Sequence, residues 1–193
     1  MLVRSLYAPR TAWIDRIRQE NASVALQIAG IVAFAVLTAI GAQIRLYLFE
    51  VPFTLQTVAV YGSGLFLGWR SGMLAQLLYL SVGMFMPVFA GDGFGPAYLL
   101  VAMSTGYLIG FPIAAAMVGA CSKKWNSFLG SALSLIVGSV IIFTCGVLWL
   151  HFAADHGTWF ESIQKGWLNF LPFDLMKIAS VSLLYTGIRH VRK

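Results

Sequence analysis

The chain has 193 residues, of which 59% are hydrophobic and only 10% charged, and its mean hydropathy is +0.81. Soluble globular domains are about a quarter charged, so this composition excludes an ordinary soluble protein and indicates an integral membrane protein. The formal net charge of +6 would suit a nucleic-acid partner only if the basic residues formed a patch. The positions of the basic residues along the chain therefore have to decide whether a nucleic-acid partner is expected.

Six apolar stretches follow one another along the chain: residues 24–44, 55–69, 72–90, 97–120, 128–150 and 168–188. A helix needs about 20 residues to cross a hydrocarbon core of about 30 Å. The second and third stretches are the shortest and meet at residues 69–71, which predicts a tight helical hairpin. The sequence thus predicts an all-α integral membrane protein, with six transmembrane helices in one compact bundle over residues 24–193. Residues 1–23 mix arginines with apolar side chains and are expected to form an amphipathic segment on the cytoplasmic surface.

The basic residues are distributed unevenly between the two sides of this bundle. Ten of the thirteen precede the first stretch, lie between the second and third or the fourth and fifth, or follow the sixth. Arg45 and Lys165 fall on the other side, and Lys177 lies inside a stretch. Cytoplasmic loops carry such an excess, so both termini are predicted to be cytoplasmic, and the positive charge reflects topology rather than a nucleic-acid partner. The protein is expected in the cell membrane as a multi-pass protein.

Several chemical motifs are missing from the sequence. It has no GxxxxGK[ST] for binding ATP, and no HExxH, GxSxG or Cys/His ligand cluster. His151, His156 and His190 lack metal-ligand spacing and are expected to be solvated or interfacial. We therefore expect no resident cofactor, no metal and no ATP site of the chain's own.

A carboxylate and an ammonium stand at the start of the sixth stretch, in LPFDLMKIAS at residues 171–180. Asp174 and Lys177 are three positions apart, so on a helix they share one face. A lone charge in hydrocarbon is costly, and such residues usually face a bundle interior or a polar cavity and mark a substrate pathway. The position predicts a ligand site reached from the outer side. The alternative is a self-satisfied ion pair that only fixes the last helix.

Two further polar segments lie on the same predicted side. In VPFTLQT, residues 51–57, Thr54 can cap the following helix, and Gln56 enters the second stretch, where an amide needs a partner. In PVFAGDGFGPAYL, residues 87–99, the glycines allow close approach of backbone to a ligand or a positive φ. A plain flexible turn would also be rich in glycine.

The first stretch carries an AxxxA motif at Ala35 and Ala39. Small residues at this spacing let helices approach closely in lipid. The motif fits packing inside the bundle and docking of a partner membrane protein equally well.

Taken together, VPFTLQT, PVFAG, TGYLIGF at residues 105–111 and FDLMK at residues 173–177 resemble, in order and spacing, the BioY family over roughly residues 30–190. These are biotin-specific substrate-binding components, or S components, of energy-coupling factor (ECF) transporters. The resemblance implies that biotin is captured from outside as the transported ligand. It also implies that ATP is bound only by partner subunits, a transmembrane coupling protein with two ATPases, and that Ala35 and Ala39 dock on the coupling protein.

The resemblance also implies a set of binding residues. We expect Asp174 to accept a hydrogen bond from a ureido N–H of biotin, and Lys177 to neutralise a ligand oxygen of its carbonyl or carboxylate. The other expected substrate-binding residues are Gln56, Gly91, Asp92, Tyr107, Tyr79 and Tyr98, and Trp159 and Phe160 are further candidates for an apolar wall. One departure from the usual family pattern is Glu50, which precedes VPFT and lies close to the predicted outer mouth.

Three other functions fit the same residues. An S component for another vitamin would share the architecture with a different pocket. An intramembrane enzyme could use Asp174 and Lys177 as acid and base, although the sequence offers no third reactive group. A purely structural partner subunit would bind no vitamin.

Overall fold

The computed structural model describes residues 18, 22–47, 50–125 and 127–191. Almost all of the predicted amphipathic segment 1–23 therefore lies outside the described residues. The helices in chain order are α2 (Val24–Gln43), α3 (Gln56–Gly83), α4 (Gly95–Val101), α5 (Thr105–Cys121), α6 (Phe128–Ala153), α7 (Trp159–Gly166), the 3₁₀ turn η1 (Leu168–Phe170) and α8 (Leu171–Val191). Two short strands, β1 (Arg45–Leu46) and β2 (Phe53–Thr54), form an antiparallel pair between α2 and α3. The prediction of an all-helical membrane protein is confirmed.

Local sequence explains where several helices begin. Ser23, Ser127 and Thr158 precede α2, α6 and α7. Each hydroxyl accepts a hydrogen bond from a backbone N–H three residues later, at 3.3, 3.1 and 3.2 Å respectively. Such side chains satisfy an amide that the first turn of a helix leaves without a partner. A short helix, α7, therefore forms between the predicted stretches 128–150 and 168–188.

Helix α3 is folded into a hairpin at Gly68, whose backbone has φ 80° and ψ −176°. In a straight helix, residues 56 and 79 would lie about 34 Å apart. Instead the Gln56 amide donates to the Tyr79 hydroxyl at 2.7 Å, and Gln76 donates to Ser63 at 3.1 Å. The two arms, residues 56–67 and 69–83, are therefore antiparallel neighbours. The predicted hairpin is present, and its turn lies at Gly68.

The predicted span at residues 97–120 is not one continuous helix. Helices α4 and α5 meet at 99°, because Ala102 adopts an extended backbone that ends α4. By length and composition, α2, α6 and the continuous segment Trp159–Arg189 can each cross a membrane, and the bent α4–α5 pair gives a fourth candidate. The arms of α3 are shorter. The number six and the cytoplasmic termini stay predictions.

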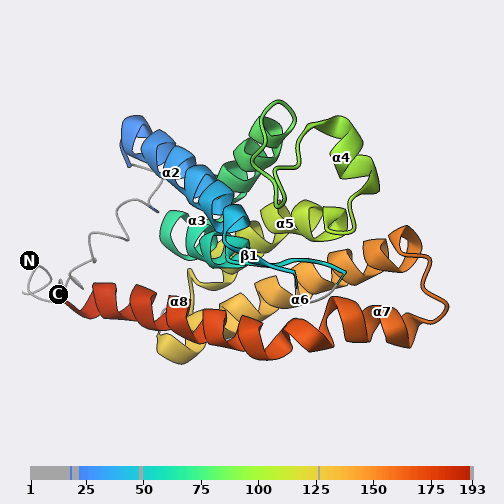
Figure 1. The fold of residues 1–193 in the computed structure, drawn as a ribbon. Helices are drawn as coiled ribbons and strands as arrows, with labels where there is room; N and C mark the ends of the chain where they lie inside the picture. Colours follow the sequence, from blue (N-terminus) through green and yellow to red (C-terminus); the bar gives the residue numbers. More distant parts are fainter. Residues whose placement is uncertain (1–17, 19–21, 48–49, 126, 192–193) are drawn as a thin grey trace, which may run out of the picture.

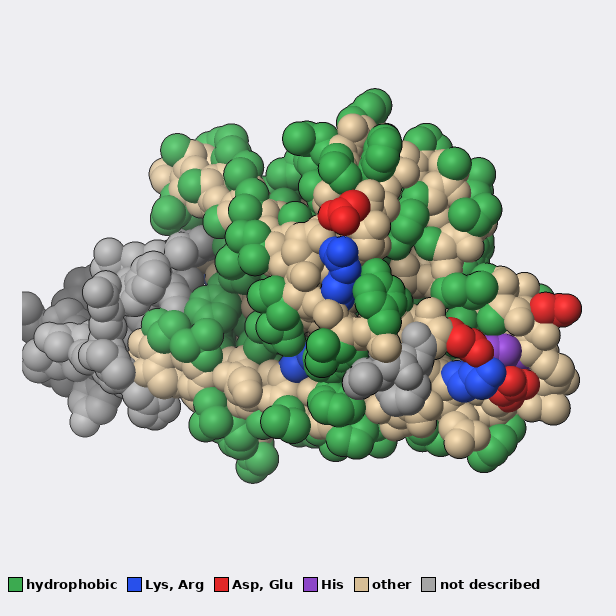
Figure 2. All heavy atoms as spheres, in the orientation of Figure 1, with side chains coloured by type: hydrophobic (Ala, Val, Ile, Leu, Met, Phe, Trp, Pro, Cys, Tyr) green, Lys and Arg blue, Asp and Glu red, His purple; other side chains and the backbone are tan. Residues whose placement is uncertain are grey.

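The helices pack as a closed series around one core. α3 contacts α2 and α5, α6 lies between α5 and α8, and α8 returns to α3. Figure 1 shows α6 and α8 running side by side along the length of the molecule. Tyr61, Leu135 and Tyr185 are fully buried in this core. The surface of these helices is largely apolar (Figure 2), as expected for contact with lipid.

Three connections meet at one end of the bundle: residues 44–55, 84–104 and 154–170. Gln43 donates to the Phe89 carbonyl at 3.2 Å, Arg45 pairs with Asp92 at 3.5 Å, and Glu50 contacts His156 at 2.7 Å. We call this the mouth end; the sequence predicts that it faces outward. At the opposite end Arg18 donates to Tyr185, to Ser122 and to the Gly119 carbonyl.

Candidate ligand-binding site

A cavity lies at the mouth end, among all the segments that converge there. Its walls come from residues 51–54, the first turn of α3, α5, α6, η1 and α8. Its open volume is about 50 Å³, whereas pockets that hold small ligands measure about 300–1,000 Å³. The cavity is therefore narrow. The residues that line it are Val51, Pro52, Phe53, Thr54, Gln56, Thr57, Ala90, Ser104, Tyr107, Leu108, Phe111, Ile142, Phe143, Phe170 and Lys177.

Lys177 is the one charged side chain among these lining residues. Its ammonium donates to the Thr54 carbonyl at 2.8 Å and to the Thr57 hydroxyl at 3.0 Å. It also lies 4.2 Å from the centroid of the Phe53 ring, a favourable position for a cation over an aromatic face. An ammonium has three donors. Two of them hold the start of α3, so one stays available to the cavity.

Asp174 lies behind the wall rather than in it. Its side chain is 1% exposed and is not among the lining residues. One carboxylate oxygen accepts from the Tyr61 hydroxyl at 2.7 Å and the other from the Ser139 hydroxyl at 2.6 Å. The expectation that both charges face inward is confirmed. None of the ion pairs between described residues joins Asp174 to Lys177, so the two charges have separate partners.

Gln56 lines the cavity, and its amide is held from both sides. It accepts from the Thr54 hydroxyl at 2.9 Å and donates to the Tyr79 hydroxyl at 2.7 Å. Tyr79, which is itself buried, donates to the Val88 carbonyl at 3.2 Å. Tyr79 thus fixes the orientation of Gln56 from outside the lining.

Two other tyrosines from the predicted set take different positions. Tyr107 lines the cavity, and its hydroxyl donates to the Gly166 carbonyl of α7 at 2.7 Å. Tyr98 does not line it. Its hydroxyl donates to the Ala90 carbonyl at 3.2 Å and lies 3.4 Å from the Ser104 hydroxyl, and both Ala90 and Ser104 are lining residues. Tyr98 therefore supports the wall.

Gly91 and Asp92 form a turn beside the cavity rather than part of its lining. Their φ angles are 77° and 58°, which glycine adopts easily and aspartate tolerates. The Asp92 side chain is exposed and pairs with Arg45. Trp159 and Phe160 are also exposed, and Trp159 stacks on His151 with ring centroids 3.8 Å apart.

Ala35 and Ala39 lie on the side of α2 that faces the second arm of α3. Ala35 is buried, and Ala39 is partly buried. Both line an apolar groove of about 540 Å³ between α2 and that arm, which also includes Val82, Met86 and Asp92. The alanines therefore lie at the edge of an open surface of the bundle.

The structure also brings in residues that the sequence did not single out. Tyr61 and Ser139 hold Asp174, and Thr57 holds Lys177. The signal for Tyr61 was a hydroxyl in the middle of an apolar stretch, where it needs a partner. His156 is not solvated, which was one of its two expected environments, because it is buried against Glu50.

Comparison with known proteins matches the BioY family over residues 16–193. A Lysinibacillus sphaericus protein named "Probable biotin transporter BioY" is 36% identical over 179 residues, 86% of this chain and 90% of that protein. "Biotin transporter BioY" of Thermotoga maritima is 38% identical over 152 residues, 78% of this chain and 88% of that protein. A solved structure described as "Crystal structure at 2.1 A of the S-component for biotin from an ECF-type ABC transporter" has the same fold. Its TM-score is 0.79 at 20% identity, and the match covers 89% of this chain and 95% of that one.

Proposed function

The chain belongs to the BioY family, and from this premise we propose that it captures biotin as the substrate-binding component of an ECF-type transporter in the cell membrane. Its relatives in Lysinibacillus and Thermotoga are named biotin transporters. It is a multi-pass membrane protein. Its function is transport and not catalysis, which sets aside the alternative of an intramembrane enzyme.

The observation that carries the proposal is that Lys177 is the one charged residue in the wall of a cavity lined mainly by apolar and aromatic side chains. Biotin has a ureido carbonyl and a carboxylate, joined by an apolar ring system and chain. The unused donor of Lys177 is suited to one of these oxygens. Phe111, Phe143 and Phe170 are suited to the apolar part.

Asp174 has a supporting role in this proposal. Its two oxygens already accept from Tyr61 and Ser139, so direct contact with a ureido N–H would require the ligand to displace one hydroxyl. Asp174 also lies one helical turn from Lys177 on α8 and carries the opposite charge. We therefore assign Asp174 to stabilising the ammonium, and regard direct ligand contact as the alternative.

Family membership also supports a proposal about the rest of the transporter. The chain has no P-loop, which fits a transporter whose energy comes from other subunits, proposed as a transmembrane coupling protein and two ATPases. The groove beside Ala35 and Ala39 is the proposed docking face for the coupling protein, because it opens at the surface of the bundle and its lining is mostly apolar.

Titration of the purified full chain in detergent with biotin, riboflavin and thiamine tests the proposal. Biotin is expected to bind tightly and saturably, and the other two vitamins not to bind. Lys177→Met is expected to weaken biotin binding about ten- to a hundredfold, since hydrogen bonds to charged groups contribute about 1.5–3 kcal/mol.

Met176→Leu is the matched control, because Met176 is the neighbouring residue and is exposed. It should leave the biotin affinity unchanged. Saturable binding of riboflavin or thiamine in place of biotin would assign another vitamin to the pocket. Equal biotin affinity in Lys177→Met and the wild type would remove Lys177 from the site.

A further inference from the structure

One wall of the cavity is a short stretch of chain at the mouth end, residues 50–54, which we call the mouth segment. Val51, Pro52 and Phe53 line the cavity, and the Thr54 carbonyl accepts from Lys177. The mouth segment is tied to the preceding chain by the two-residue pairing of β1 with β2, which joins Leu46 to Phe53 and Arg45 to Thr54. A pairing this short adds little stability by itself.

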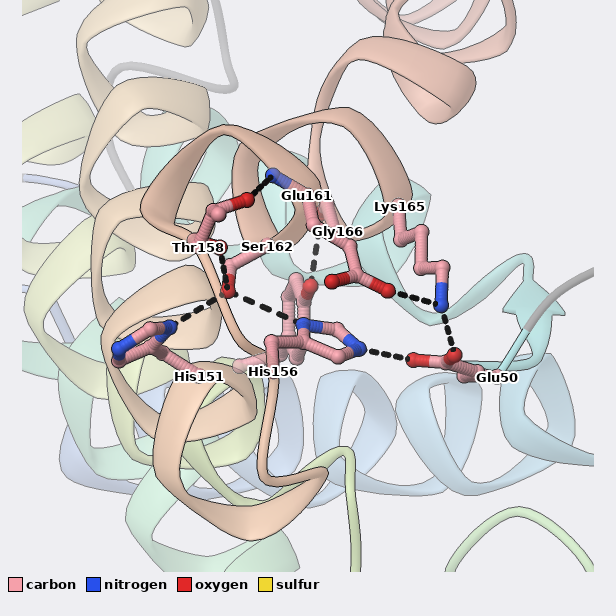
Figure 3. A network of polar contacts seen from close by, with 9 residues as sticks. Glu50, His151, His156, Thr158, Glu161, Ser162, Lys165 and Gly166 are labelled. Carbon is pink, nitrogen blue, oxygen red and sulfur yellow. Dashed lines mark hydrogen bonds and ion pairs between the residues drawn. The ribbon is translucent and has the colours of Figure 1, made fainter.

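Glu50 joins the mouth segment to α7 and to the connection before it. Its two carboxylate oxygens lie 2.7 Å from Nε2 of His156 and 2.6 Å from Nζ of Lys165. Lys165 also contacts Glu161 at 2.7 Å. Figure 3 shows these side chains converging across the gap between the two chain segments. More than 100 residues of sequence separate Glu50 from each of its partners.

His156 is held in place from behind. It is 9% exposed, and its Nδ1 lies 3.0 Å from the Ser162 hydroxyl, which in turn lies 2.8 Å from Nδ1 of His151 (Figure 3). Exposed ion pairs contribute little, because two flexible side chains must be ordered in water. The contact with His156 differs, since one partner is already buried and fixed.

Helix α7 is itself anchored to the cavity wall. The Gly166 carbonyl at its end accepts from the buried Tyr107 hydroxyl at 2.7 Å. Glu50 therefore connects a weakly tied segment on one side of the cavity to an anchored helix on the other. The contacts of Glu50 with His156 and Lys165 close the ring of segments around the cavity.

The cavity has an open volume of about 50 Å³, and a ligand of vitamin size needs several times more space. A wall must move to admit it, and the mouth segment is the wall with the shortest backbone pairing. We propose that Glu50, with His156 and Lys165, forms a latch that holds the mouth segment closed over the cavity and sets how fast ligand enters and leaves. That the ligand is biotin rests on the proposed function, whereas the closing of the mouth segment over the cavity does not.

Hydrogen exchange of the full chain in detergent, without biotin, tests the closure. Glu50→Gln should accelerate exchange in residues 50–57 roughly tenfold, because it removes a charge-assisted contact. Exchange in α6 and α8 should stay unchanged. Glu161→Gln is the matched control: it removes the same charge beside Lys165 and leaves both contacts of Glu50 in place.

Biotin kinetics test the consequence. Glu50→Gln should raise the association and dissociation rates of biotin together, with a smaller change in affinity, because a latch acts on the path and not on the bound contacts. Glu50→Lys should raise both rates at least as much as Glu50→Gln, because it places a second cation beside Lys165 and removes the acceptor from His156.

The two proposals fail in different ways. Unchanged exchange in Glu50→Gln, with biotin still bound by the wild type, would overturn the latch and leave biotin capture standing. Accelerated exchange at residues 50–57 in a chain that binds no biotin would overturn the proposed function and support the latch. Acceleration that extends equally to α6 would show a general loss of stability and would count against the latch.

Discussion

The two opposite charges of α8 are stabilised in different ways at the scale of single residues. Lys177 is held by a carbonyl and a hydroxyl of the α3 entrance, and by the face of Phe53. Asp174 is held by two hydroxyls from α3 and α6. A buried charge costs much less when hydrogen bonds replace its hydration. The direct ion pair that the spacing allowed is therefore not needed to keep either charge inside the bundle.

Tyr61→Phe tests how Asp174 is stabilised. The change keeps the ring and removes one of two donors to the carboxylate, so the free energy of unfolding is expected to fall by about 1.5–3 kcal/mol. Chemical denaturation in detergent measures it. Ser180→Ala on α8 is the control, because its exposed hydroxyl bonds only its own helix and its removal should change little. Equal effects of the two changes would show that the carboxylate finds another donor.

At the scale of elements, the hairpin in α3 depends on one backbone conformation. Gly68 lies at φ 80° and ψ −176°, a region essentially restricted to glycine. The turn places Gln56 beside Tyr79 and so shapes one wall of the cavity. Gly119 of α5 lies close behind the turn, where an added Cβ would come within 2.3 Å of the Trp69 nitrogen.

Gly68→Ala is expected to lower the free energy of unfolding by about 1–3 kcal/mol through backbone strain. Overlap with distant parts of the chain is not the cause, because among the described residues the nearest such heavy atom lies 3.7 Å from an added Cβ. The control is Gly187→Ala in α8, where a Cβ meets nothing within 4 Å. That change should stabilise by about 0.5–1 kcal/mol. Thermal unfolding of both variants measures the contrast, and equal shifts would argue against strain at the turn.

At the scale of the whole molecule, charged side chains gather where the long connections meet. Figure 2 shows acidic, basic and histidine side chains clustered over α7, on a surface that is otherwise largely apolar. At this end, hydrogen bonds and ion pairs join the three long connections to one another around the cavity. The hydrogen bond from Lys165 is the main cause that lowers the pKa of the Glu50 carboxyl from its ordinary value of 4.5; burial opposes it, and His156 adds to it.

The direction of that shift predicts an acid dependence for the closure of the mouth segment. A carboxyl with a lowered pKa in the folded state contributes fully above its ordinary pKa, and loses the contribution as pH falls through the lowered value. Exchange at residues 50–57 should therefore accelerate only below about pH 4.5. In Glu50→Gln, exchange at residues 50–57 should not accelerate further in acid. The other titratable groups nearby, His156, His151, Glu161 and Lys165, are still present in that variant, so the difference reports on Glu50. An identical acid step in both proteins would assign it to another group.

Much of the element structure could be read from local sequence. Apolar length located α2, α6 and α8 to within a few residues, and a hairpin was expected between two short stretches at residues 69–71, next to the observed turn at Gly68. The bend between α4 and α5 could not be read, because Ser104 and Thr105 beside it are also tolerated inside a straight transmembrane helix, and composition does not distinguish a straight helix from a bent one. For the site, Lys177, Gln56 and Tyr107 were anticipated and line the cavity, while their roles in binding stay predictions.

The sequence by itself determined that this chain resides in a membrane, where α2, α6 and α8 lie, and that Asp174 and Lys177 turn inward. These follow from the cost of moving apolar and charged groups between water and lipid, which each residue carries wherever it stands. Only the tertiary structure decided the partners: Tyr61 is 113 residues from Asp174, and Lys165 is 115 from Glu50. Such pairs depend on which helix faces meet, a property of the packed bundle and not of any one segment.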